Sequence, residues 1–124
     1  MSNDKIQAYA ATQKQTMSPR EVEAMALTKA AVLLEEARSN PENRDAIAQA
    51  LRFNHLLWTI IQADISEPEN QLPAEIKANI MSLSIFIDKQ TVKALKSSRP
   101  EDLEALININ RNLAAGLREN AAAG

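Results

Sequence analysis

The sequence predicts an all-α fold: a single-domain up-down helical bundle of four main helices, with a short N-terminal helical segment. The 124 residues include only two glycines and five prolines, and alanine, leucine, glutamate and lysine, which favour helices, are abundant. Apolar residues recur at helical spacing along most of the chain. A chain of this length can bury a sufficient core without disulfides, and it has no cysteine. We therefore treat 1–124 as one helical domain.

A capping box marks the first main helix. Ser18 is the expected N-cap, Pro19 the first helical position, and Glu21 the side chain that reaches back to the cap. This pattern predicts a helix from Pro19 to about Arg38.

Three further helices begin beside prolines. The segment 40–42 (Asn-Pro-Glu) predicts the start of a second helix that extends to about residue 65. Pro73, followed by Glu75, predicts a third helix that ends near residue 97. The segment 98–101 (Ser-Arg-Pro-Glu) predicts a fourth helix that ends near residue 118. Short connections favour antiparallel neighbours.

The two ends of the chain are expected to differ from these helices. In the N-terminal segment, 1–17, the spacing of Ile6 and Tyr9 fits a short amphipathic helix. The alanine-rich tail, 119–124, should fray because nothing in its sequence would anchor it.

The second helix has the widest apolar arc. At about 100° per residue, one face carries Ile47, Leu51, Asn54, Trp58, Ile61 and Ile65, and the arc continues through Phe53, Leu56, Leu57 and Ile60. An arc this wide predicts a central helix that is contacted on several sides. The fourth helix has a single stripe through Leu106, Asn110 and Leu117, which is typical of an outer helix.

The third helix has two apolar stripes. Ile80, Leu83 and Ile87 lie on one side and are assigned to the core, whereas Met81, Ile85 and Val92 lie opposite. The second stripe needs cover, either from the N-terminal segment with Ile6 and Tyr9 or from another molecule. We treat these five residues, Met81, Ile85, Val92, Ile6 and Tyr9, as candidates for partner binding, because exposed apolar patches usually mark interaction sites.

Asparagines within apolar stripes are the most unusual feature. Asn54 and Asn110 lie in the centres of their stripes, and a buried amide without a hydrogen bond costs roughly 1–3 kcal/mol. Either the two amides close a local network that specifies the packing register, or they await the backbone of a partner. Trp58 is expected to be the largest side chain of the core.

No catalytic or metal-binding pattern is visible. His55 is the only histidine, no activated nucleophile accompanies it, and neither zinc-ligand nor diiron-type spacing occurs. We therefore expect no enzymatic activity, no metal and no cofactor. Lys89, Lys93, Lys96 and Arg99 line up near the end of the third helix. They fit either an acidic partner or RNA, or favourable placement at a helix C-terminus.

Charge and hydropathy restrict the location and the partners. The net charge is −2, from 14 basic and 16 acidic residues, so direct nucleic-acid binding is disfavoured because it depends on clustered cations. No apolar run is long enough for a transmembrane helix, and the N-terminus lacks the apolar core of a signal peptide. A cytoplasmic protein without membrane contact is expected.

Four segments resemble the FlaF family of flagellar biosynthesis regulators. They are 8–27 (AYAATQKQTMSPREVEAMAL), 54–58 (NHLLW), 70–87 (NQLPAEIKANIMSLSIFI) and 106–117 (LININRNLAAGL). None is a strong motif alone, but their order and spacing, in a chain of this length, are specific. The resemblance covers nearly all of residues 6–117.

The resemblance implies a non-enzymatic protein that supports flagellin synthesis, secretion and flagellum assembly. In that family the expected partners are flagellin, bound as by a secretion chaperone, and the regulator FlbT. The alternative is a post-transcriptional regulator of flagellin messenger RNA that acts directly or through FlbT. The family pattern contributes no catalytic residues.

Overall fold

The computed structural model describes residues 18–123, except for the side chains of residues 19 and 120–123. This part of the chain is helical and contains no strand, as expected. Its elements are α2 (Pro19–Ser39), α3 (Arg44–Ile65), α4 (Ala74–Ser97), the 3₁₀ helix η1 (Pro100–Leu103) and α5 (Glu104–Ala123). The N-terminal segment that carries Ile6 and Tyr9 lies outside the described residues.

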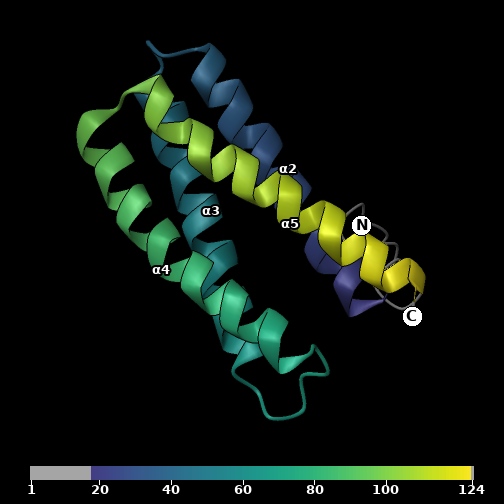
Figure 1. Ribbon diagram of the computed structural model, residues 1–124. Coiled ribbons are helices and arrows are strands. Elements are labelled where there is room, and N and C mark those ends of the chain that lie inside the picture. Colours follow the sequence, from purple (N-terminus) through teal and green to yellow (C-terminus); the bar gives the residue numbers. More distant parts are fainter. Residues whose placement is uncertain (1–17, 124) are drawn as a thin grey trace, which may run out of the picture.

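The helices form an open bundle in which α3 is central (Figure 1). The long helices α2 and α5 lie side by side, α3 packs against α2, and α4 runs back along α3. The main contacts of α4 are with α3 and η1 alone. Figure 1 shows α4 and α5 meeting at η1 and diverging from there, so α4 is an edge helix with a large outer surface.

Capping explains where α2 begins. The Ser18 side chain accepts a hydrogen bond from the Glu21 backbone N–H at 3.1 Å, as the capping box predicts. The helix ends at Ser39, within one residue of the expected position.

The predicted start of the second main helix is wrong. Asn40 ends α2 rather than starting α3, since its backbone N–H donates to the Ala37 carbonyl at 3.1 Å. The Asn40 side-chain amide also donates to the Glu36 carbonyl at 3.1 Å. Asn43 is the N-cap of α3 and accepts from the Ala46 N–H at 3.0 Å. Asparagine is suitable at either end of a helix, so the sequence alone did not distinguish the two positions.

The junction before α5 also differs from the expected single helix. Ser98, the C-cap of α4, adopts a left-handed conformation with φ 52° and donates its N–H to the Ala94 carbonyl at 2.9 Å. The chain then forms the 3₁₀ turn η1 before α5 begins. At its other end α5 continues to Ala123, beyond the expected end near Arg118.

Alanines of α2 and large side chains of α2, α3 and α5, among them Leu27 and Leu34, build the core. The buried residues of α2 include the alanines Ala24, Ala30, Ala31 and Ala37, and small residues let neighbouring helices approach closely. Trp58 and Leu51 on α3, and Leu106 and Ile107 on α5, fill the centre. The fourth-helix stripe through Leu106, Asn110 and Leu117 is buried as predicted.

A buried polar relay connects α3 with α5. Trp58 Nε1–H donates to Asn110 Oδ1 at 2.9 Å, and Asn110 Nδ2–H donates to Asn54 Oδ1 at 2.7 Å. All three side chains have zero exposed area. Of the two alternatives for the asparagines, the local network is the one observed. It links α3 to α5 in a single register, because the amide of Asn110 must reach both partners at once.

Candidate protein-binding surface

Large apolar side chains are exposed in two separate places. One group lies on α4 and comprises Ile85, Phe86, Val92 and Leu95; the other lies on α2 and α3 and comprises Met25, Val32, Leu56 and Ile60. Apolar side chains scattered singly on a surface need no explanation, but grouped ones usually mark a contact with another molecule.

The exposed side of α4 forms a straight row, which we call the α4 ridge. It consists of Ile85, Lys89, Val92 and Lys96, with Leu95 beside it. At about 100° per residue, the first four fall within an arc of roughly 60°. Ile85 and Val92 are 54% and 52% exposed, and they stand two helical turns apart.

The opposite side of α4 is held against α3. Ile80, Ile87 and Ala94 are buried there. Two buried hydroxyl groups on this side bond within the helix: Thr91 Oγ1 donates to the Ile87 carbonyl at 2.7 Å, and Ser84 Oγ donates to the Met81 carbonyl at 2.7 Å. Both buried hydroxyl groups on the core face are therefore hydrogen-bonded. The ridge lies on the other side of α4 and faces away from the bundle.

Two of the five predicted partner-binding residues, Ile85 and Val92, lie in the α4 ridge. Met81 is half-buried and packs against the core, with its Sδ 3.7 Å from Ser84 Oγ, so it lies at the margin of the ridge. Ile6 and Tyr9 lie outside the described residues. Leu95 was missed, although it follows Val92 by less than one turn and shares its periodicity.

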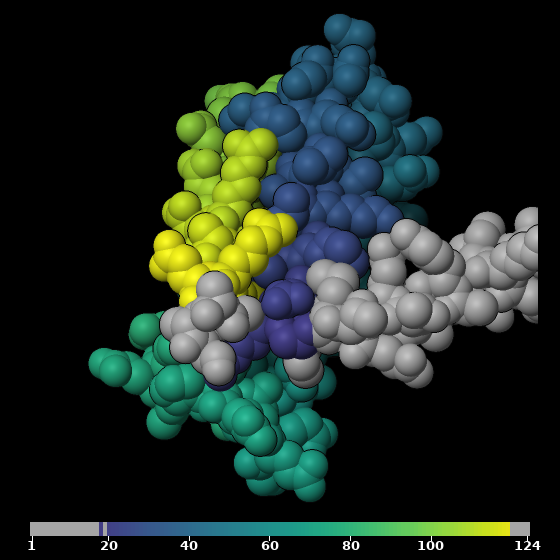
Figure 2. Space-filling model, turned by 90° about the vertical axis from the view of Figure 1, so that its right-hand side faces the viewer, coloured from purple at the N-terminus to yellow at the C-terminus, as the bar shows by residue number. Residues whose placement is uncertain are grey.

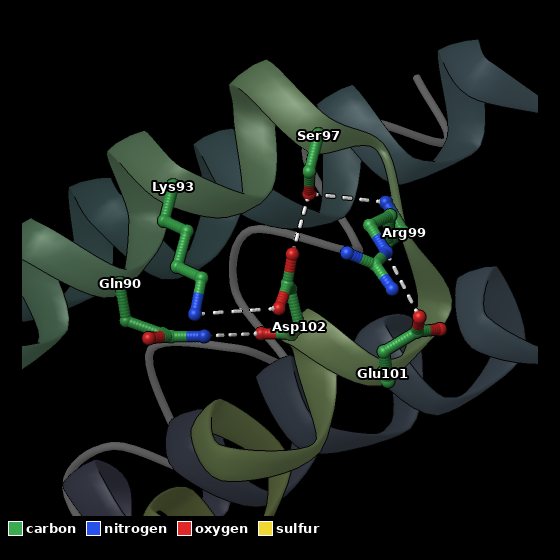
Figure 3. A network of polar contacts seen from close by, with 6 residues as sticks. All are labelled: Gln90, Lys93, Ser97, Arg99, Glu101 and Asp102. Atoms are coloured by element: carbon green, nitrogen blue, oxygen red, sulfur yellow. Dashed lines mark hydrogen bonds and ion pairs between the residues drawn. The ribbon is translucent and has the colours of Figure 1, made fainter.

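A polar network fixes the C-terminal end of α4 to η1 (Figure 3). Asp102 is its centre: Oδ2 accepts from Ser97 Oγ at 2.5 Å, Oδ1 lies 3.8 Å from Lys93 Nζ, and the backbone carbonyl accepts from Gln90 Nε2 at 2.8 Å. Asp102 thus connects three consecutive turns of α4 to the start of the next helix, and this sets the direction in which the ridge faces.

The predicted row of cations divides into two kinds. Lys93 pairs with Asp102, and Arg99 Nε lies 2.9 Å from Glu101 Oε1. Both cations therefore pair with acidic residues of η1. Lys89 and Lys96 are exposed, and no ion pair joins either to an acidic side chain in the described part of the chain.

The second apolar group forms what we call the α2–α3 face. Leu56 and Ile60 are 60% and 56% exposed, so the expectation that the whole apolar arc of α3 is covered is wrong. On this face Lys29 Nζ lies 5.6 Å from the centre of the Phe53 ring, within the range of a cation–π contact. The face was missed because the apolar arc of α3 was interpreted as core throughout.

A groove lies at one end of the α2–α3 face, between the last turns of α2 and the first turns of α3. Its volume is about 440 Å³, and its apolar lining includes Leu33, Ala37, Ala50 and Phe53. Figure 2 views the molecule from the side of α2, with α5 against one flank and the α3–α4 connection projecting at one end.

A half-buried carboxyl pair, Glu23 and Asp64, lies at the opposite end of α2. Burial and a hydrogen bond with Asp64 of α3 raise the pKa of Glu23 to about 8, and the negative charge of Asp64 acts in the same direction. Asp64 Oδ2 also accepts from Asn70 Nδ2 at 3.3 Å. This pair connects the start of α2 with the end of α3 and confirms that the two helices run antiparallel.

Other chemistry in the described residues is sparse. His55 is exposed on α3. Within residues 18–123 no group of three or more histidine, aspartate or glutamate side chains could hold a metal ion. No described helix is both long enough and apolar enough to cross a membrane.

Comparison with known proteins decides the family. The family model described as flagellar protein FlaF matches residues 5–117. The chain belongs to the FlaF family. The match covers nearly the whole chain and includes the α4 ridge and the buried relay, so the resemblance seen in the sequence is confirmed. No curated protein and no solved structure matches the chain. Membership of the FlaF family makes this a flagellar protein.

Proposed function

We propose that this FlaF protein acts in the cytoplasm without catalysis, by holding a helix of flagellin against the α4 ridge. Through that contact it would support flagellin synthesis, secretion and flagellum assembly, together with FlbT. The observation that carries the proposal is the exposed pair Ile85 and Val92 on an edge helix whose other side is fully occupied.

The shape of the ridge suits a helical partner. Apolar residues that recur at helical spacing form the usual seam between two packed helices. Because α4 packs mainly on α3 and η1, a partner helix can lie along it without displacing any described element. A chaperone of this kind needs only to cover the apolar stripe of its client.

The experiment is a pull-down with the full-length protein and purified flagellin and FlbT as separate prey. Ile85→Lys and Val92→Lys should each weaken flagellin capture by more than about tenfold, because burying one such side chain contributes about 1.5–3 kcal/mol. The helical circular dichroism and the melting temperature should stay near those of the wild type, since both side chains are already exposed.

Asn108→Lys is the control, because Asn108 is exposed on α5 and belongs to neither of the two exposed apolar groups. It should capture flagellin normally. Failure of the wild type to capture flagellin, or equal capture by the ridge variants, would overturn the proposal. Recovery of flagellin messenger RNA from cells without flagellin would support the RNA regulator instead.

A further inference from the structure

We infer that the α4 ridge recognises an amphipathic helix that carries acidic residues beside its apolar stripe. This inference rests on the proposed function for the place of docking, and it adds the chemical character of the partner.

Charge is distributed unevenly between α4 and the rest of the chain. The whole chain has a net charge of −2. By contrast, α4 has a positive balance, because its charged residues are Glu75, Lys77, Asp88, Lys89, Lys93 and Lys96. After Asp88 every charged residue of this helix is a lysine. The second half of α4, which carries Val92 and Leu95, is therefore a basic surface on an acidic molecule.

The acidic groups of η1, at the C-terminal end of α4, are already engaged, whereas Asp88 on α4 itself is exposed and joins none of the ion pairs among the described residues. Asp102 accepts a hydrogen bond from the Ser97 hydroxyl and pairs with Lys93. Glu101 pairs with Arg99. Among the described residues none forms an ion pair with Lys89 or Lys96. These two lysines consequently present positive charge that the described part of the molecule does not compensate.

The lysines and the apolar residues of the ridge alternate along the helix. Lys89 and Lys96 stand two turns apart, as do Ile85 and Val92, and all four lie in one row. A helix docked on this row meets an apolar side chain and a cation alternately. Apolar contact in the seam with opposite charges beside it is the arrangement by which helix pairs select partners. The methylene stems of the lysines can cover the apolar seam while their ammonium groups reach its edge.

Other partners fit less well. A neutral or basic helix would remove water from the two ammonium groups without supplying an opposite charge, which is costly. A nucleic-acid backbone could meet the lysines, but it would leave Ile85 and Val92 uncovered between them. An acidic amphipathic helix satisfies both features at once.

The test uses two designed helical peptides with identical apolar positions, one with glutamate and one with lysine at the flanking positions. Binding to the full-length protein is measured by titration at low and high salt. The acidic peptide should bind at least about tenfold more tightly than the basic one, and high salt should reduce this difference. In the variant Lys89→Glu/Lys96→Glu the preference should disappear or reverse.

The double variant Arg44→Glu/Arg52→Glu is the control, because it changes the net charge equally but on exposed positions of α3. It should retain the preference for the acidic peptide. Equal binding of both peptides, or an unchanged preference after reversal of Lys89 and Lys96, would overturn the inference. Tight binding of a single-stranded RNA of the same length that competes with the acidic peptide would also count against it.

The two proposals can fail separately. Ridge-dependent binding of the acidic peptide without any capture of flagellin would leave this inference standing and reject flagellin as the partner. Flagellin capture that depends on Ile85 and Val92 but is unaffected by reversal of Lys89 and Lys96 would support flagellin as the partner and reject this inference.

Discussion

At the scale of single residues, Asn110 must make two buried hydrogen bonds at once. Its side-chain oxygen accepts from Trp58 and its amide donates to Asn54, inside a fully buried contact between α3 and α5. No leucine or alanine can replace it without leaving the indole N–H and the Asn54 oxygen unpaired. Asn54 is only partly satisfied, because its Nδ2 has no hydrogen-bond partner among the described residues.

The first prediction compares these two residues. Asn110→Leu should lower the free energy of unfolding by about 1–3 kcal/mol, because two buried polar groups lose their partners. Asn54→Leu should cost less, since it deprives only Asn110 of one acceptor and removes an unpaired amide. Urea unfolding followed by the fluorescence of Trp58 measures both. A larger loss for Asn54→Leu would mean that the relay has been assigned in the wrong direction.

The second prediction concerns Glu23 and pH. The folded state holds its proton up to a pKa of about 8, whereas the ordinary value is 4.5. Between these values the unfolded chain loses a proton that the folded protein keeps, so stability should fall as the pH rises through this window. Glu23→Gln, which is neutral throughout, should be more stable than the wild type above pH 8 and should show no such gain below pH 4.5.

Melting temperatures measured across this pH range test the prediction. Glu36→Gln, at an exposed position of the same helix, is the control for the loss of one acidic side chain. A parallel shift of Glu23→Gln at every pH would show that packing rather than titration is responsible.

At the scale of elements, α3 shows that one helix can be both central and partly exposed. It lies between α2 and α4 and carries the longest set of buried residues in the described chain. Its outer side nevertheless leaves Leu56 and Ile60 in water. The exposed fraction therefore differs sharply between neighbouring residues of α3: Ile60 is 56% exposed and Ile61 is 2% exposed.

The third prediction uses this contrast. Ile61→Ala should destabilise the protein by about 2–5 kcal/mol, because it leaves a cavity in the core. Ile60→Ala should cost less than about 1 kcal/mol, as usual for a surface position. The two variants delete the same atoms from adjacent positions, so chemical denaturation compares burial alone. Similar losses would indicate that another part of the chain covers Ile60.

At the scale of the whole molecule, the ridge depends on how α4 is attached. Its main described neighbours are α3 and η1, and its C-terminal end is tied down through Asp102 (Figure 3). An element with few neighbours opens more readily than the rest of a fold. The orientation of the α4 ridge is therefore controlled by a junction outside the ridge.

The fourth prediction tests this junction. Asp102→Ala removes a charged hydrogen bond worth about 1.5–3 kcal/mol, so amide hydrogen exchange in the last turns of α4 should accelerate at least about tenfold. The exchange of α2 should change much less. Glu101→Ala is the matched control, because its exposed pair with Arg99 should contribute little. Equal acceleration in α2 and α4 would mean that Asp102 stabilises the whole fold.

Local sequence features were sufficient to predict the helices and their main faces. Helix composition, the Ser18 capping box and the apolar periodicity are local properties, and each depends on residues within a few turns of one another. For that reason the all-α fold, the single stripe of α5 and the outward position of Ile85 and Val92 were all predictable. The burial of Asn110 was predictable too, because it lies in the middle of its stripe.

Tertiary structure decided what covers each face. The arc of α3 looked uniformly like core, but Leu56 and Ile60 are left open because α2 and α4 cover only part of it. Asn40 is the C-cap of α2, and its amide bonds to α2 rather than to α3. A local network was only one of two alternatives for Asn54 and Asn110, and neither the bond from Trp58 nor the role of Asp102 was predictable from the sequence. Contacts of this kind join residues far apart in the chain, and only the packing of the helices brings them together.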